Sequence, residues 1–85
     1  MSDGGLTHPG ELVLREMQSR GWNQQTLAAI LGWSTQYLSD IIRGRRGISA
    51  RAAVDISEAF DMSALGWLQL DAEYRLAREM QKRER

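Results

Sequence analysis

Five polar side chains between positions 35 and 40 could recognise the edges of DNA bases. They are Thr35, Gln36, Tyr37, Ser39 and Asp40. The Gln36 amide can donate and accept at once, which matches adenine N6 and N7, and a good bidentate pair discriminates between bases by about 1–3 kcal/mol. Thr35 could add methyl or hydroxyl contacts, Tyr37 could touch a thymine methyl or a phosphate, and Asp40 could accept from cytosine. The alternative is that these residues are only the solvated face of a short helix.

A basic cluster follows these polar residues directly. Arg43, Arg45, Arg46 and Arg51 fall within nine positions that contain no acidic residue. We expect the first three to contact the sugar-phosphate backbone, which would give position and salt dependence without sequence information, and Gln24 could join them. The net charge of the chain is zero, which by itself argues against a nucleic-acid binder. The prediction therefore depends on how the charge is distributed, and the alternative is an arginine run that serves only solubility.

Other kinds of chemistry lack the residues that they need. The chain has no cysteine and a single histidine, His8, with no set of acidic residues at metal-ligand spacing beside it. We therefore expect no metal site, no catalytic triad and no cofactor. We also find no paired carboxylates and no phosphate-cradling glycine loop, and we expect that the protein is not an enzyme. His8 is expected to act locally, in a cap or a turn.

The sequence also bears on location and size. The opening segment MSDGGLTHPGEL lacks the basic start and the apolar run of a signal peptide. No apolar stretch approaches the roughly 18 residues that cross a bilayer, so we expect no membrane association. The absence of cysteine suits a reducing compartment, and 85 residues suit one compact domain. We expect a soluble, cytoplasmic protein.

Helix-terminating and helix-capping residues divide the chain into five expected helices. Strand-like alternation is almost absent, which indicates an all-α protein. Proline suits the first turn of a helix, asparagine and serine suit its N-cap, and glycine suits the position after its end. In chain order the signals are Pro9 and Gly21, Asn23 and Gly32, Ser34 and Gly44, and then the N-caps Ser49 and Ser63.

The second and third of these helices have the outline of a helix-turn-helix. They are short, they are separated by a tight turn, and the small residue Ala28 stands four positions before Gly32, where we expect the helices to cross closely. In such a motif the second helix lies in the major groove. We therefore expect Ser34 to Gly44 to form the recognition helix. Its apolar stripe should face the core: Leu38, Ile41 and Ile42.

The remaining segments are expected to serve packing and assembly. We divide the chain into a flexible N-terminus (1–5), a helix-turn-helix domain (6–76) and a charged C-terminal tail (77–85) that frays or stays disordered. The tryptophans at positions 22, 33 and 67 should pack in the core. Leu65, Leu68 and Leu76 could close that core or pair with a second chain. We favour a contribution to a homodimer, because short recognition units usually work as dimers.

Several short motifs lie along residues 6–76. The more specific ones are His8-Pro9-Gly10-Glu11 and Trp67-Leu68-Gln69-Leu70. The others are Gly21-Trp22-Asn23-Gln24, Leu27-Ala28 with Leu31-Gly32, the run IIRGRRGIS over 41–49, and Tyr74. Together these motifs resemble one family, the HigA-type antitoxins within the Cro/repressor-like (XRE) helix-turn-helix group.

The resemblance implies an all-α, five-helix, lambda-repressor-like DNA-binding domain. Members of the family are small dimeric proteins that repress their own operon and neutralise a ribosome-dependent, mRNA-cleaving toxin of the HigB/RelE kind. The resemblance therefore implies two partners for this chain: a palindromic double-stranded DNA operator and a toxin of the HigB/RelE kind. The chain departs from the family at Asp40, where similar proteins often carry a basic residue. It also departs over 62–66, where the family tends to have a proline and an aromatic residue before the tryptophan.

Two other interpretations stay open at this stage. A stand-alone phage or plasmid repressor without a toxin would share every DNA-facing residue named above. A protein-interaction module that keeps the helix-turn-helix shape but has lost DNA binding would fit the zero net charge and the acidic Asp40.

Overall fold

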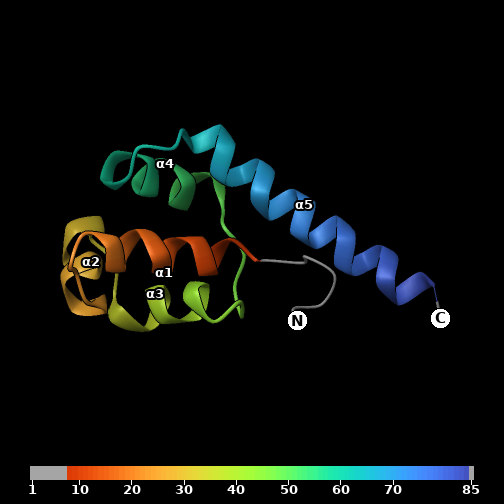
Figure 1. Cartoon of the computed structure of the whole chain (residues 1–85), viewed down its shortest axis with the longest axis horizontal. Helices are drawn as coiled ribbons and strands as arrows, with labels where there is room; N and C mark the ends of the chain where they lie inside the picture. The colour runs from red at the N-terminus through yellow and green to blue at the C-terminus, as the bar shows by residue number, and fades with distance from the viewer. Residues whose placement is uncertain (1–7, 85) are drawn as a thin grey trace.

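The computed structural model describes residues 8–84, and this part of the chain forms five α-helices and no strand (Figure 1). The expected all-α, five-helix class is confirmed. No helix within 8–84 is long and apolar enough to cross a membrane. The predicted flexible N-terminus, residues 1–5, lies outside the described residues. The helices are α1 (Pro9–Ser19), α2 (Gln24–Leu31), α3 (Thr35–Ile42), α4 (Ala50–Ala59) and α5 (Ala64–Arg83).

Side-chain caps start four of the five helices where the sequence predicts them. Each capping oxygen accepts the backbone N–H three residues further on, which satisfies a donor that has no partner inside the helix. The caps are Asn23 to Thr26 at 2.8 Å, Ser34 to Tyr37 at 3.1 Å, Ser49 to Ala52 at 3.1 Å and Ser63 to Gly66 at 3.0 Å. Gly32 follows α2 with a φ of 75°, a left-handed conformation that suits glycine, as expected.

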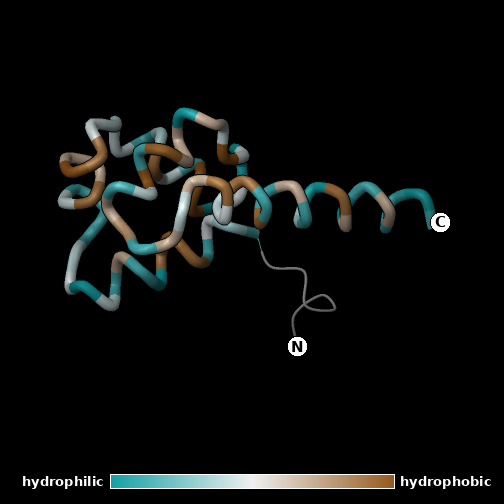
Figure 2. Tube along the Cα trace, turned by 90° about the horizontal axis from the view of Figure 1, so that it is seen from above, coloured by the Kyte–Doolittle hydropathy of each residue, from teal (hydrophilic) through white to brown (hydrophobic). Residues whose placement is uncertain are grey.

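The core lies where the five helices meet. α1 packs on α3 and α5, α2 packs on α3 and α4, and α4 packs on α5. The expected apolar stripe of α3 is buried, and Ala28 is 2% exposed. Trp67 is fully buried, while Trp22 and Trp33 are half-buried against the core, so the predicted packing role of the three tryptophans is confirmed. Figure 2 shows the hydrophobic residues concentrated in the body formed by the helices and alternating with hydrophilic ones along the end of α5.

Gly10 explains part of the motif at the start of α1. It is buried, and a Cβ at this position would overlap the carbonyl oxygen of Ile41. The N-terminus of α1 can therefore approach the end of α3 only because residue 10 has no side chain. His8 stands at the N-cap position of α1, but its side chain makes no capping hydrogen bond there. Its ring packs instead near Tyr74 of α5, with ring centroids 5.7 Å apart.

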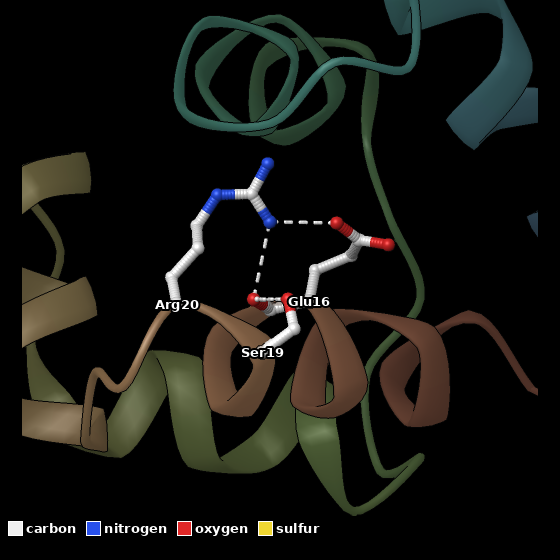
Figure 3. Close-up of polar contacts among 3 residues, drawn as sticks. All are labelled: Glu16, Ser19 and Arg20. Atoms are coloured by element: carbon white, nitrogen blue, oxygen red, sulfur yellow. Dashed lines mark hydrogen bonds and ion pairs between the residues drawn. The ribbon is translucent and has the colours of Figure 1, made fainter.

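A polar cluster closes the other end of α1 (Figure 3). Arg20 forms an ion pair with Glu16 at 2.6 Å and donates to its backbone carbonyl at 3.1 Å. Ser19 donates to the same carbonyl at 2.9 Å. The Arg20 guanidinium also lies 4.7 Å from the ring centroid of Phe60, at the end of α4. The cluster thus fixes the end of α1 against the turn between α4 and α5, and its role is structural.

The last helix is longer than expected. Residues 77–83 were predicted to belong to a fraying tail, but α5 continues to Arg83 and projects from the body (Figure 1). One side-chain pair four residues apart lies within this exposed part, Glu79 with Arg83 at 3.1 Å, and Asp71 pairs with Arg75 at 2.9 Å just before it. Two cations, Lys82 and Arg83, also occupy the last turn, where the helix dipole favours positive charge. The division of the chain at residue 76 stays a prediction.

Candidate nucleic-acid interface

The predicted base-reading residues of α3 are all at least partly exposed to solvent. Thr35 and Gln36, in the first turn, are exposed, while Tyr37, Ser39 and Asp40 are half-buried. The opposite side of the helix is anchored by its buried apolar stripe, so this face has a fixed direction. In a helix-turn-helix the N-terminal turn of the second helix is the part that meets base edges. The geometry is thus compatible with base reading for Thr35 and Gln36 in particular.

Gln36 and Asp40 are joined by a hydrogen bond. The Gln36 amide nitrogen Nε2 donates to Asp40 Oδ1 at 2.9 Å. The pair lies four residues apart on one helix, a spacing at which glutamine and aspartate are known to interact. The bond leaves Gln36 Oε1 and one amide proton free and fixes which way the amide faces. Asp40 is therefore engaged by a neighbour that is itself a predicted reading residue.

Tyr37 belongs to a chain of contacts that ties α3 to its surroundings. Its ring meets Trp33 edge to face, with ring centroids 4.8 Å apart. The guanidinium of Arg46 lies 4.8 Å from the centroid of the Tyr37 ring. Trp33 in turn donates its indole N–H to Asp55 of α4 at 2.9 Å. The structure therefore places Tyr37 as a half-buried link between the turn, α4 and the arginine loop, rather than as a free side chain.

The three predicted phosphate-binding arginines gather just past the end of α3. Arg43, Arg45 and Arg46 are all exposed. Backbone hydrogen bonds hold this loop, including Arg45 N–H to Asp40 O at 2.8 Å, and Gly44 makes the turn with a φ of 78°. We call residues 43–47 the arginine loop. Arg51, which we had noted only as part of the basic cluster, is exposed in the first turn of α4.

Gln24 lies apart from these arginines. It occupies the first position of α2, where it is half-buried and lines a shallow hollow with Leu14 and Trp22. Among the described residues, no contact joins Gln24 to the arginine loop. Its predicted role in phosphate binding therefore depends on the N-terminus of α2 rather than on a shared cluster.

The predicted assembly residues are found on α5 with different exposures. Leu65 is 65% exposed and Leu76 is 62% exposed, while Leu68 is half-buried and packs against the core. Met80, which we did not predict, is 56% exposed. Leu65, Ala72, Leu76 and Met80 follow one another at spacings of seven, four and four, which places them on one face of the helix. We call this set the apolar stripe of α5.

Comparisons with known proteins agree with this geometry. Residues 13–68 match a family model described as "Helix-turn-helix". Virulence-associated protein A′ of Dichelobacter nodosus is 41% identical over 71 residues, which are 82% of this chain and 62% of that protein. The chain thus spans less than two thirds of the length of this curated relative.

Solved structures match over more of their length. The antitoxin HigA of Pseudomonas aeruginosa, solved with the higBA promoter, is 38% identical, with a TM-score of 0.81, over 86% of this chain and 80% of that one. An addiction module antidote protein of a HigA family from Coxiella burnetii is 27% identical, with a TM-score of 0.84, over 89% of this chain and 84% of that one.

Proposed function

The chain belongs to the helix-turn-helix family and, within it, to the HigA-type antitoxins, and from this membership we propose that it is a sequence-specific DNA-binding antitoxin. In this proposal it represses its own operon by binding a palindromic operator, and it neutralises a HigB/RelE-like toxin that cleaves mRNA. In this proposal it acts by binding rather than by catalysis, and it does so in the cytoplasm.

The observation that supports DNA binding best is the Gln36–Asp40 pair beside the arginine loop. A carboxylate near DNA would repel phosphates, which, with the zero net charge, was an argument for a module that has lost DNA binding. Asp40 keeps its charge, but it accepts from Gln36 at 2.9 Å, which gives the carboxylate a role within the helix. The bond also holds the Gln36 amide in one orientation, which lowers the entropy that base recognition would cost. We propose that Gln36 reads an adenine and that Thr35, Tyr37, Ser39 and Asp40 define its surroundings.

The arginine loop gives the proposed complex its register on the duplex. Arg43, Arg45 and Arg46 are exposed on a loop whose backbone is hydrogen-bonded. Phosphate contacts of this kind position the protein and make binding depend on salt, whereas base contacts specify the site. We propose that Gln24 adds a further phosphate contact from the start of α2.

A homodimer would match the two halves of a palindrome. We propose that the apolar stripe of α5 forms the dimer contact, because its leucines and Met80 are more than half exposed in the single chain. An isologous interface uses the same patch on both subunits, and an exposed apolar helix face can pack against a second copy of itself. Leu68 contributes less in this proposal, since it already packs against the core.

A mobility-shift assay with the protein's own upstream DNA tests the proposal. Gln36→Ala should weaken operator binding by about 5- to 150-fold, which corresponds to the 1–3 kcal/mol of a bidentate base contact, and should leave binding to unrelated DNA unchanged. Arg43→Ala should weaken binding to both DNAs alike. Arg15→Gln, at an exposed position of α1, is the control for loss of one positive charge. If neither Gln36→Ala nor Arg43→Ala changes binding, the proposed docking of α3 is wrong.

The role of Asp40 is tested by a double-mutant cycle with Gln36. If Asp40 orients the amide, Asp40→Ala should weaken operator binding in the wild type and have a smaller effect in a Gln36→Ala background. If Asp40 only repels phosphates, Asp40→Ala should strengthen binding to operator and unrelated DNA in both backgrounds.

The toxin partner is tested by co-expression with the product of the neighbouring reading frame. An antitoxin should restore the growth of cells that express that product and should co-purify with it, even when Arg43→Ala has weakened DNA binding. A stand-alone repressor would bind the same operator but would have no such effect on growth.

A further inference from the structure

A basic groove lies between the arginine loop and α5, mostly along the second half of that helix, residues 75–83, which projects from the body. It has a volume of about 430 Å³. Arg45 and Arg46 line it from the loop, and Arg75, Arg78 and Lys82 line it from α5. These three α5 residues follow one another at spacings of three and four, so they share one face of the helix. The groove therefore brings five cationic side chains from two distant parts of the sequence to one place.

The acidic residues of the groove do not cancel this charge. Asp71 and Glu79 also line it. Asp71 is buried and already pairs with Arg75 at 2.9 Å and accepts from the backbone of Ile48 at 3.2 Å. Glu79 pairs with Arg83 at 3.1 Å, and Arg83 is not among the lining residues. The positive charge of Arg45, Arg46, Arg78 and Lys82 is left in excess.

We infer that this groove binds the phosphate backbone of the same DNA that α3 reads. In this inference α5 adds phosphate contacts to those of the arginine loop. The inference rests on the proposed function. Continuity supports it, because Arg45 and Arg46 belong both to the arginine loop and to the groove. Charge supports it as well, since a phosphate backbone is the anion that the arginine loop is proposed to meet. Residues 75–83 extend over about 14 Å at the helical rise, long enough to follow the backbone rather than to touch one point.

The apolar stripe of α5 leaves this face free. Leu76 and Met80 are exposed and do not line the groove. Spacings of two residues, such as Leu76 to Arg78 and Met80 to Lys82, place side chains far apart around a helix. A second copy of the chain on the stripe and a DNA backbone in the groove can therefore occupy α5 together.

The test is the salt dependence of operator binding, measured by fluorescence anisotropy with the full chain. Each lost phosphate contact lowers the magnitude of the negative slope of log K against log salt by about 0.9. We expect Arg78→Gln and Lys82→Gln each to lower that magnitude by about the same amount and to weaken binding to operator and unrelated DNA alike. Lys82→Arg should keep the wild-type slope, and Arg15→Gln, which removes a charge outside the groove, should leave it unchanged. Circular dichroism checks that the exposed substitutions leave the fold intact.

Several results would overturn the inference while the proposed function stands. One is that Arg78→Gln and Lys82→Gln both keep the wild-type salt slope, although the wild-type protein does bind its operator. A second is an equal loss in Arg15→Gln, which would mean that net charge alone matters. A third is that the α5 variants bind DNA normally but lose the toxin in a pull-down, which would assign the groove to an acidic protein segment. Failure of the wild-type protein to bind any operator would instead reject the proposed function, and this inference with it.

Discussion

The two halves of α5 differ although they form one continuous helix. In the first half, residues 64–74, Trp67 is fully buried and Asp71 is 7% exposed. In the second half, residues 75–83, every side chain is exposed except the half-buried Ala77. The first half is held by packing, whereas the second is held by the Glu79–Arg83 pair, by the Asp71–Arg75 pair that joins it to the first half, and by helical continuity. The same secondary structure therefore serves the core in one half and leaves its faces free for partners in the other.

This difference matters for function because the free half has two unlike faces. One carries the apolar Leu76 and Met80, and the other carries Arg78 and Lys82. A packed helix must give its apolar face to the core, as the first half does with Trp67. A projecting helix can give one face to a second copy and the other to DNA.

Trp67→Ala should have the largest effect, because it removes a fully buried ring from the packed half. The expected loss is about 3–5 kcal/mol in the free energy of unfolding, measured by urea denaturation. Trp67→Phe should lose less unfolding free energy than Trp67→Ala, and it can still be measured if the alanine variant does not fold. Leu76→Ala, in the projecting half, should change the stability of the monomer by less than about 0.5 kcal/mol. Equal losses of unfolding free energy at positions 67 and 76 would mean that the two halves of α5 do not differ in how they are held.

Asp71→Ala should have an intermediate effect, since Asp71 lies where the two halves meet. The change leaves the buried Ile48 N–H without its acceptor, at a cost of about 1–3 kcal/mol in unfolding free energy. It also frees Arg75, whose guanidinium packs against Gly47 of the arginine loop. Glu79→Ala is the matched control, because the exposed pair of Glu79 with Arg83 contributes less than about 1 kcal/mol. A loss at Asp71 no larger than that at Glu79 would mean that the buried contact is unimportant.

Leu76→Glu should have the smallest effect on the fold and act on assembly instead. A charge on the apolar stripe should raise the dimer dissociation constant by about tenfold or more, because burial of a leucine contributes about 1.5–3 kcal/mol. Sedimentation equilibrium measures this constant. Val54→Glu makes the same kind of change at a residue of α4 that is 48% exposed and should leave the dimer intact. Equal weakening by both variants would exclude the stripe as the specific contact.

Much of the candidate site was accessible from local sequence patterns. The outer face of α3 and its buried stripe follow from helical spacing, whereas the arginines were found as a basic cluster that the family motif over 41–49 also contains. The Gln36–Asp40 bond was missed although its spacing of four residues was a usable signal. The persistence of α5 beyond residue 76 was missed for a similar reason, since the spacing of four between Glu79 and Arg83 was read only as part of a charged run.

The sequence by itself determined where the capped helices begin, because a cap such as Asn23, Ser34 or Ser49 acts on a backbone N–H only three residues away. It also determined which residues of α3 face outward, since helical periodicity assigns each side chain to a face. Only the tertiary structure decided that Trp33 donates to Asp55, that Asp71 accepts from Ile48, and that Arg78 and Lys82 lie across a groove from the arginine loop. These contacts join residues more than 20 positions apart, and their partners depend on how whole helices pack rather than on any local pattern.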